Sequence, residues 1–195
     1  MLWLVWIGII AIVAAGVVLV IRQQRLEPSS QQGETPPLER TIFTLQIGDI
    51  VQYMDADWVV EGKLTYEEDG FSWYEYMLQD GDRIRWLSVE EDDLVEVAWL
   101  EATNSLDVSS HPPQQINFAG DSYRCMDSGV AQMTRKGNVQ RRKAQQCRFF
   151  DYEAAEGKVL SVEDWNGEIE VTVGQRIRPS DLSLLPGSGG SIYRS

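Results

Sequence analysis

The stretch RIRWLSVEEDDLVEV, residues 83–97, recurs in altered form as GKVLSVEDWNGEIEV, residues 157–171. Both contain Leu-Ser-Val-Glu, followed by an acidic turn and a short run rich in β-branched residues. The matched positions include Tyr76 with Tyr152, Gly81 with Gly157, Leu87 with Leu160, Glu90 with Glu163 and Val97 with Val171. Because matched positions stay between 72 and 76 residues apart, only short turn insertions separate the two halves. This spacing predicts an internal duplication.

Each half contains short runs of aromatic and β-branched residues bounded by turn residues, a pattern typical of β-strands. In the first half these runs cover residues 57–64, 71–78 and 84–89. In the second half Asn166-Gly167 suits a tight hairpin turn, because both residues accept a positive φ. No segment after residue 40 carries an apolar stripe at the helical period. The sequence therefore predicts an all-β fold with four or five antiparallel strands in each half.

Large apolar or aromatic side chains occupy both faces of the run 71–78. A sheet with one face in water would alternate more cleanly between apolar and polar residues. Since about 70 residues alone have only a marginal core, we expect the two halves to close on each other as an antiparallel sandwich or barrel-like domain. This duplicated domain is predicted at residues 41–185, with copies at about 45–103 and 116–185 and a disordered tail at 186–195.

The N-terminal stretch Leu2–Ile21 has no charged or strongly polar side chain. A helix of this length spans about 30 Å, the thickness of the hydrocarbon core of a bilayer. We therefore predict one transmembrane anchor at residues 1–21, which contacts the lipid bilayer. A cleaved signal peptide is the alternative, although no basic region precedes the apolar stretch. Arg22 and Arg25 follow the helix directly, which predicts a cytoplasmic C-terminal domain joined to the anchor by a flexible tether at residues 22–40.

The net charge of −13 is concentrated in one half of the chain. Residues 41–111 hold 17 acidic and 3 basic side chains, whereas residues 112–195 hold 10 and 11. This balance disfavours nucleic acid as a partner, because phosphate backbones require a basic face. Solubility and the binding of a cationic partner are both open explanations of the acidity. Cys125 and Cys147 are too far apart for a Cys-x-x-Cys motif and are expected to be buried thiols.

Few residues suggest catalysis. The single histidine, His111, precedes two prolines in an expected exposed connection, where it is a poor candidate for a general base. The acidic run Glu90–Asp93 lacks the alternating carboxylates and the glycine of a calcium loop, so we interpret it as a solvated turn. No glycine loop of the kind that binds phosphate is found in a strand–helix context. We therefore predict a protein that is not an enzyme, with no catalytic residue, no metal site and no cofactor.

The tract RKGNVQRRK, residues 135–143, carries five positive charges and no acid, and it begins at an expected hairpin tip. Near a bilayer it would attract anionic headgroups by about 1 kcal/mol per charge. An acidic patch on a partner, or a solvated hairpin with no partner, would explain it equally well. A predicted turn also contains a tryptophan suited to an exposed anchor. The candidate partner- or lipid-binding residues are Arg135, Lys136, Arg141, Arg142, Lys143 and Trp165.

Several motifs carry a family resemblance, namely IGDIVQY, WYEYML and RIRWLSVE in the first half, and CRFFDYE and LSVEDWNGEIEVTVGQRI in the second. Over residues 45–185 the chain resembles the domain-of-unknown-function family numbered 4178. With its single N-terminal anchor it is most similar to versions from oxygenic photosynthetic bacteria. The family has no established catalytic residues, so the resemblance implies a fold and a membrane setting and no chemistry.

Two functions of different classes follow from these features. The first is a membrane-anchored accessory protein that binds an integral-membrane protein complex on its cytoplasmic face during assembly or maintenance, at a thylakoid or plasma membrane. The resemblance suggests a photosystem intermediate as the partner. The second is a β-barrel module that binds a small ligand or a lipid, with a cationic ligand in its acidic half. A lined cavity would favour the second function, and a tightly packed interior would exclude it.

Overall fold

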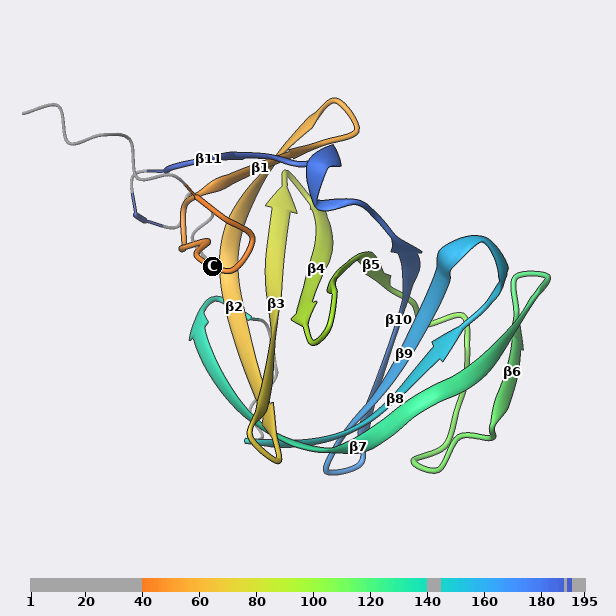
Figure 1. Ribbon diagram of the computed structural model, residues 1–195. Helices are drawn as coiled ribbons and strands as arrows, with labels where there is room; N and C mark the ends of the chain where they lie inside the picture. The colour runs from red at the N-terminus through yellow and green to blue at the C-terminus, as the bar shows by residue number, and fades with distance from the viewer. Residues whose placement is uncertain (1–39, 140–144, 188, 191–195) are drawn as a thin grey trace, which may run out of the picture. The chain divides into compact units, whose positions relative to one another are not determined.

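Strands account for nearly all regular structure in the computed structural model, which describes residues 40–139, 145–187 and 189–190 (Figure 1). The first half contributes β1 (Ile50–Tyr53), β2 (Ala56–Glu68), β3 (Phe71–Asp80), β4 (Arg83–Glu91) and β5 (Val95–Ala102). The second half contributes β6 (Gln115–Phe118), β7 (Asp121–Gly137), β8 (Gln146–Glu153), β9 (Lys158–Trp165) and β10 (Glu168–Arg176). The short 3₁₀ helices η1 (Ala155–Gly157) and η2 (Pro179–Asp181) and the strand β11 (Ser183–Leu185) complete the described chain. The prediction of an all-β fold is confirmed.

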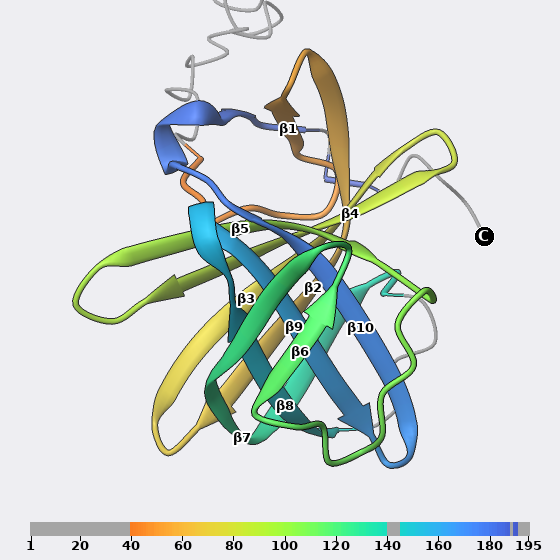
Figure 2. The same ribbon diagram turned by 90° about the vertical axis from the view of Figure 1, so that its right-hand side faces the viewer.

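Neighbouring strands are antiparallel throughout the described sheet, in the order β11-β1-β2-β3-β4-β5-β10-β9-β8-β7-β6. An additional pairing joins β2 to β7, so the eight strands from β2 to β7 in this order close into a barrel. Figure 2 shows the strands β8, β9 and β10 of this wall running side by side. The barrel is thus the observed form of the two expected architectures, and closure leaves no free edge among its eight strands.

Equivalent strand pairings recur in the two halves. The long strands β2 and β7 each carry an irregularity in register near their start, between Val60 and Gly62 and between Cys125 and Asp127. The matching cross-strand pairs are Tyr76–Leu87 with Tyr152–Leu160, and Val89–Val97 with Val162–Val171. This register agrees with the alignment of the two repeated sequences.

The seam between β5 and β10, where the two halves meet, depends on a glycine. Leu100 of β5 lies opposite Gly174 of β10. A Cβ atom at position 174 would stand 1.9 Å from the carbonyl oxygen of Trp99, far inside van der Waals contact. The missing side chain therefore allows the two backbones to approach closely enough to pair.

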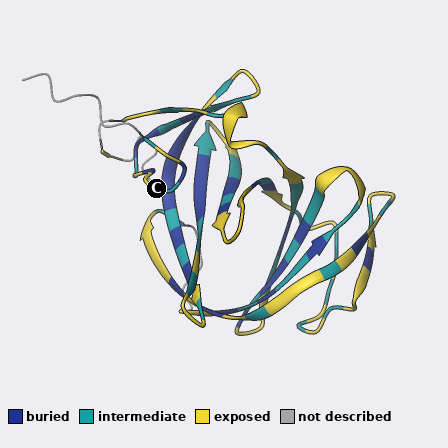
Figure 3. Cartoon of the chain, in the orientation of Figure 1, coloured by how far each residue is buried: buried dark blue, intermediate teal, exposed yellow. Residues whose placement is uncertain are grey.

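Apolar side chains pack both inside the barrel and against its outer wall, as the long buried stretches on β2 and β3 in Figure 3 illustrate. Consecutive residues of β3 are fully buried because Met77 faces the interior while Tyr76 and Leu78 face outward. The inner cluster includes Leu64, Tyr66, Met77, Trp86, Leu100, Met133, Cys147 and Trp165. The outer clusters pack under residues 42–47 and 177–184 in the first half and under β6 and the preceding connection in the second. Because apolar clusters cover the barrel wall on both its inner and its outer side, the strands lack a clean alternation of apolar and polar residues.

The predicted anchor at residues 1–21 and the predicted tether, apart from Arg40, lie outside the described residues. Where the described chain begins, Arg40 Nε forms an ion pair with the fully buried Asp49 at 2.7 Å. The other carboxylate oxygen of Asp49 accepts the N–H of Gly187 at 2.8 Å, which ties the start of the domain to the segment after β11. None of the described segments is a helix long and apolar enough to cross a membrane.

Candidate functional site: an acidic cavity inside the barrel

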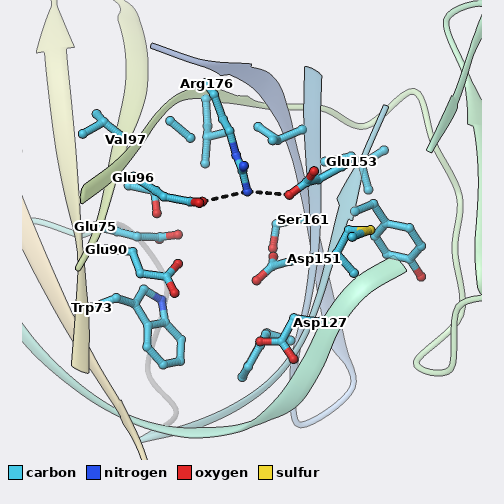
Figure 4. Close-up of a pocket in the computed structure, with 18 of the residues that line it drawn as sticks. Trp73, Glu75, Glu90, Glu96, Val97, Asp127, Asp151, Glu153, Ser161 and Arg176 are labelled. Atoms are coloured by element: carbon cyan, nitrogen blue, oxygen red, sulfur yellow. Dashed lines mark hydrogen bonds and ion pairs between the residues drawn. The ribbon is translucent and has the colours of Figure 1, made fainter. Parts of the chain in front are cut away.

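The barrel interior contains a cavity of about 230 Å³ next to the inner apolar cluster. A cavity of this size is large enough for a small organic molecule. Figure 4 shows Trp73, Glu75 and Glu90 facing Asp127 and Asp151 across the open space. Eight acidic side chains line the cavity, four from each half of the chain: Glu68, Glu75, Glu90, Glu96, Asp127, Asp151, Glu153 and Glu163. The other lining residues include the aromatic Phe71, Trp73, Phe149 and Tyr152, and Arg176, which is the one cation among the lining residues that the structure describes.

Strand alternation brings these carboxylates inside the barrel. Every second residue of a strand faces the same side, so Trp86, Ser88 and Glu90 of β4 follow one another along the inner face. Trp86 belongs to the inner apolar cluster, whereas Ser88 and Glu90 line the cavity. The inner face of β8 changes in the same way, from Phe149 to Asp151. The interior thus passes from apolar to acidic along the same strands.

The most deeply buried carboxylates of the cavity, Glu75 and Glu163, are joined through Tyr66. They are 8% and 5% exposed. The hydroxyl of Tyr66 lies 2.8 Å from Glu163 Oε1 and 3.1 Å from Glu75 Oε2, and the indole N–H of Trp165 donates to Glu163 Oε2 at 3.3 Å. A phenol has only one proton to donate. Two acidic groups from β3 and β9 therefore share one neutral donor, which holds their charges close together.

Arg176 lies at the more exposed part of the cavity, where it joins three strands. Its guanidinium forms an ion pair with Glu96 Oε2 of β5 at 2.7 Å and a second one with Glu153 of β8 (Figure 4). The side chains of these three residues are between 36% and 44% exposed, in contrast to the buried Glu75 and Glu163. The cavity therefore has a buried level, where Tyr66 and Trp165 donate to carboxylates, and a more exposed level that holds Arg176.

Burial and neighbouring acids raise the pKa of two acidic residues of the cavity. Burial raises the pKa of Asp151 from its ordinary 3.8 to about 7, and the neighbouring charges of Glu163, Glu90 and Asp127 act in the same direction, while a hydrogen bond from Ser161 opposes them. Burial also raises the pKa of Glu90, together with the nearby Glu96 and Asp127, against the lowering effect of Arg176. Both shifts mean that negative charge here is costly without a compensating cation.

The structure describes only part of the basic tract predicted as a binding surface. Arg135 and Lys136 are exposed, but they lie within β7, opposite Leu64 and Lys63 of β2, and do not form the expected hairpin tip. Lys63 and Lys136 are neighbouring like charges: burial, and then Lys136, lowers the pKa of Lys63. Outside the described residues lie Arg141, Arg142 and Lys143.

The expectation that Trp165 is an exposed anchor is wrong. Trp165 is the last residue of β9 rather than part of the turn, and it is only 5% exposed. Alternation along β9 explains this position, because Ser161 and Glu163 line the cavity and Trp165 follows them on the same inner face. The side chain packs in the inner apolar cluster, with its ring 6.2 Å from that of Tyr66.

From the sequence, the run Glu90–Asp93 is interpreted as a solvated turn, and no other acid of the cavity is singled out. All four residues of this run are exposed, but Glu90 also lines the cavity. The charge difference between the halves is no guide either, because the near-neutral half supplies as many of these acids as the acidic half. A usable signal is an acid two positions from large apolar residues on a strand, as in Trp73-x-Glu75-x-Met77.

The acidic groups are distributed around the wall and do not converge on one point. Within the described ranges, no three His, Cys, Asp or Glu side chains are grouped as metal ligands would be. His111 lies away from the cavity, where its Nε2 is 3.1 Å from Arg148. Both cysteines are free thiols; Cys147 is buried in the inner apolar cluster as expected, whereas Cys125 is only partly buried, contrary to the expectation.

A closed antiparallel β-barrel with an acidic interior cavity is the class of protein that this fold and site define. The chain belongs to the family described as "Domain of unknown function (DUF4178)", whose model matches residues 46–179. It is 30% identical over 199 residues to uncharacterized proteins of Mycobacterium bovis and of two strains of Mycobacterium tuberculosis, a match that covers 94% of this chain and 95% of each relative. The similarity therefore extends beyond the family domain. No solved structure matches the chain.

Proposed function

We propose that the barrel binds a small organic cation, such as a protonated aliphatic amine, in its interior cavity. The observation that supports this best is the composition of the wall, to which the described residues contribute eight acids and one arginine around a cavity of about 230 Å³. An ammonium group donates charge-assisted hydrogen bonds to carboxylates and would neutralise part of the negative charge of this wall. The raised pKa values of Asp151 and Glu90, caused first by burial and then by neighbouring acids, agree with a wall that a bound cation would stabilise.

The aromatic wall favours an organic cation over a bare ion. Trp73 and Phe149 line the cavity with their rings packed edge to face, at 5.2 Å between centroids. A cation over an aromatic face gains about 0.5–2 kcal/mol, and the same rings provide an apolar surface for an alkyl chain. The acids come from separate strands around this wall, which suits an extended molecule with a charged end.

A matched pair of neighbouring glutamates tests this proposal in the full-length protein. Glu90 and Glu91 are both exposed residues at the end of β4, but of the two only Glu90 lines the cavity. Isothermal titration with n-butylamine, choline and 1,4-diaminobutane should show binding of at least one cation, with Ca²⁺ as a bare-ion comparison. Glu90→Gln should weaken that binding about 10-fold, because a charge-assisted hydrogen bond contributes about 1.5–3 kcal/mol. Glu91→Gln should change it by less than about 2-fold.

Two results would count against the binding of a cation inside the barrel. One is the absence of saturable binding for every organic cation tested. The other is an equal loss of affinity in Glu90→Gln and Glu91→Gln, which would indicate general attraction to an acidic surface.

A second proposal keeps the membrane-anchored accessory protein predicted from the sequence. Its support is the uncharged stretch Leu2–Ile21 with Arg22 and Arg25 behind it, and the cluster of like charges at Lys63 and Lys136 on the outer wall. The partner would be an integral-membrane complex at a thylakoid or plasma membrane, and the resemblance to versions from photosynthetic bacteria suggests a photosystem intermediate. Purification of the tagged protein in mild detergent should recover membrane-complex subunits, and recovery should fall when the charges of residues 135–143 are removed.

A further inference from the structure

A groove of about 470 Å³ lies on the outside of the barrel, over the seam between β5 and β10. It runs between the outer apolar clusters of the two halves, with Trp99 on the side of the first and Tyr123 on the side of the second. Aromatic and aliphatic side chains provide most of its described lining, among them Tyr53, Met54, Trp99, Phe118 and Tyr123. The groove is larger than the inner cavity, and its volume lies within the range of about 300–1,000 Å³ that is typical of small-molecule sites.

The charged side chains of the groove are paired with one another. Arg85 binds Glu101 at 2.8 Å, and Lys158 binds both carboxylate oxygens of Asp121 at 2.8 Å. No other acid or base is among the described lining residues, so the two ion pairs leave this wall without net charge. A neutral molecule suits such a wall, because a charged one would lose hydration without gaining a counter-charge.

Tyr123 supplies an unused hydrogen-bond donor. The residue is only 4% exposed, and its hydroxyl has no hydrogen-bond partner in the described part of the chain, yet it is not enclosed by protein. Because Tyr123 lines the groove, the hydroxyl is open to a molecule bound there. Burial, and then Asp121, raises the pKa of Tyr123 against the lowering effect of Lys158. The phenol therefore keeps its proton at neutral pH and can donate it to an acceptor oxygen.

The rim of the groove carries an exposed methionine in an unfavourable backbone conformation. Met54 and Asp55 form the turn between β1 and β2, with φ angles of 52° and 59°. Turns of this kind favour Asn or Gly, and the equivalent turn between β6 and β7 has the small residues Ala119 and Gly120, with φ angles of 52° and 89°. Met54 is nevertheless 79% exposed and lines the groove. A flexible apolar side chain held here at a cost in stability points to contact with a ligand.

We propose that this groove is a second binding site, for a neutral planar aromatic molecule that carries an acceptor oxygen, such as an aryl amide. The rings of Tyr53 and Trp99, 4.8 Å apart between centroids, offer an aromatic surface for the ring of the ligand. Met54 covers that ring from the rim, and the hydroxyl of Tyr123 donates to the acceptor oxygen. The site lies on the outer wall, apart from the acids of the inner cavity.

Three naphthalenes of similar size test the ligand class. At pH 7, 2-naphthamide is neutral with an acceptor oxygen, 2-naphthoate is an anion, and 2-methylnaphthalene has no acceptor. Equilibrium dialysis with the full-length protein should show saturable binding of the amide. The anion should bind about 10-fold more weakly, because its charge is not balanced in the groove. The hydrocarbon should bind about 5-fold more weakly, which is the change that a neutral hydrogen bond makes.

Met54→Gly should have two effects of opposite sign. It removes an apolar side chain from the rim, so binding of 2-naphthamide should weaken about 5-fold. It also lets the turn adopt its positive φ without a Cβ atom, so the free energy of unfolding should stay the same or rise. Ala119→Gly is the matched control, because it relieves the same φ in the equivalent turn but removes only a methyl group. Its affinity for the amide should stay within about 2-fold of the native value.

Tyr123→Phe tests the hydrogen bond. The variant should bind 2-naphthamide about 5-fold more weakly and should bind 2-methylnaphthalene as the native protein does, because the hydrocarbon accepts no hydrogen bond. Equal losses for the two molecules would remove the hydroxyl of Tyr123 from the site.

Three results would overturn the groove as a ligand site. The first is the absence of saturable binding of 2-naphthamide. The second is binding that Glu90→Gln weakens and Met54→Gly does not, which would place the amide in the inner cavity. The third is a dimer that Met54→Gly dissociates, which would show that a second copy covers the groove. Met54→Gly should leave the affinity for n-butylamine unchanged, so this site and the proposed amine site can each fail without the other.

Discussion

The two ends of the barrel interior are formed by the same strands but carry opposite chemistry. At one end the inner positions are occupied by apolar side chains such as Leu64, Met77 and Trp86, which are at most 6% exposed. At the other end the next inner positions on β3 and β4 are Glu75 and, beyond Ser88, Glu90. Barrel closure pairs the backbone hydrogen-bonding groups at both ends equally, so the two ends differ in their side chains alone. The apolar end supplies stability, and the acidic end is free to serve binding.

The largest expected effect comes from opening a hole in the apolar end. Leu64 is fully buried in the inner apolar cluster and lies opposite Glu75 on the neighbouring strand. Leu64→Ala should lower the free energy of unfolding by about 2–5 kcal/mol, through lost burial and the remaining cavity. Urea denaturation followed by tryptophan fluorescence measures this change. The free energy of unfolding of Glu90→Gln, a substitution at the acidic end, should stay within about 0.5 kcal/mol of the native value. Equal losses of stability in the two variants would contradict the proposed difference between the apolar and the acidic end.

A smaller effect is expected at the boundary between the ends. Tyr66→Phe removes the hydroxyl that Glu75 and Glu163 share. Loss of a donor to a buried carboxylate costs about 1–3 kcal/mol, and chemical denaturation at neutral pH measures it. In the double variant Tyr66→Phe/Glu163→Gln one of the two charges is gone, so the cost of losing the hydroxyl should be smaller than in the single variant. If Tyr66→Phe lowers the free energy of unfolding equally in the native protein and in Glu163→Gln, the Tyr66 hydroxyl does not act through Glu163.

The all-β fold and the pairing within each half were predictable because they depend on local signals. Asp-Gly and Asn-Gly turns set the hairpins, and the repeated Leu-Ser-Val-Glu fixed which strands correspond. Barrel closure was not predictable in the same way. It depends on β2 meeting β7 at Gly62 and Gly137 and on β5 meeting β10, contacts between residues far apart in sequence. A sandwich would satisfy the same local pattern.

The candidate site was harder to predict because alternation does not say which face of a strand is the interior. On β3 the set Trp73, Glu75 and Met77 faces inward, yet Tyr74, Tyr76 and Leu78 on the outer face are just as apolar. Solvated acids are the usual case, so the acids of β3, β4 and β8 gave no reason to favour the interior. Trp165 was misplaced for the same reason, since one residue of difference at a strand end decides between the turn and the inner face.

The smallest expected effect on stability concerns pH and a single acid of the cavity. The pKa of Asp151 is about 7 in the folded protein and near 3.8 when it is free of its surroundings. Between these values the folded protein holds a proton that the unfolded chain releases, so this group's contribution to stability is full below about pH 4 and is lost as the pH rises toward 7. Asparagine at this position cannot ionise. Between pH 5 and pH 8 the free energy of unfolding of Asp151→Asn should therefore fall by about 1–2 kcal/mol less than that of the native protein. This value is smaller than the full pKa shift implies, because solvent in the open cavity screens the charge.

Urea denaturation of both proteins at the two pH values measures this difference. The groups that act on Asp151 are Ser161, Glu163, Glu90 and Asp127, and all are kept in the variant, so their own titration largely cancels. Leu64→Ala should keep the native pH dependence in spite of its lower stability, because no titratable group changes. A native protein and an Asp151→Asn variant with parallel pH profiles would mean that the acidic end already holds its charges at no cost. In that case the interior would not need a bound cation to balance them.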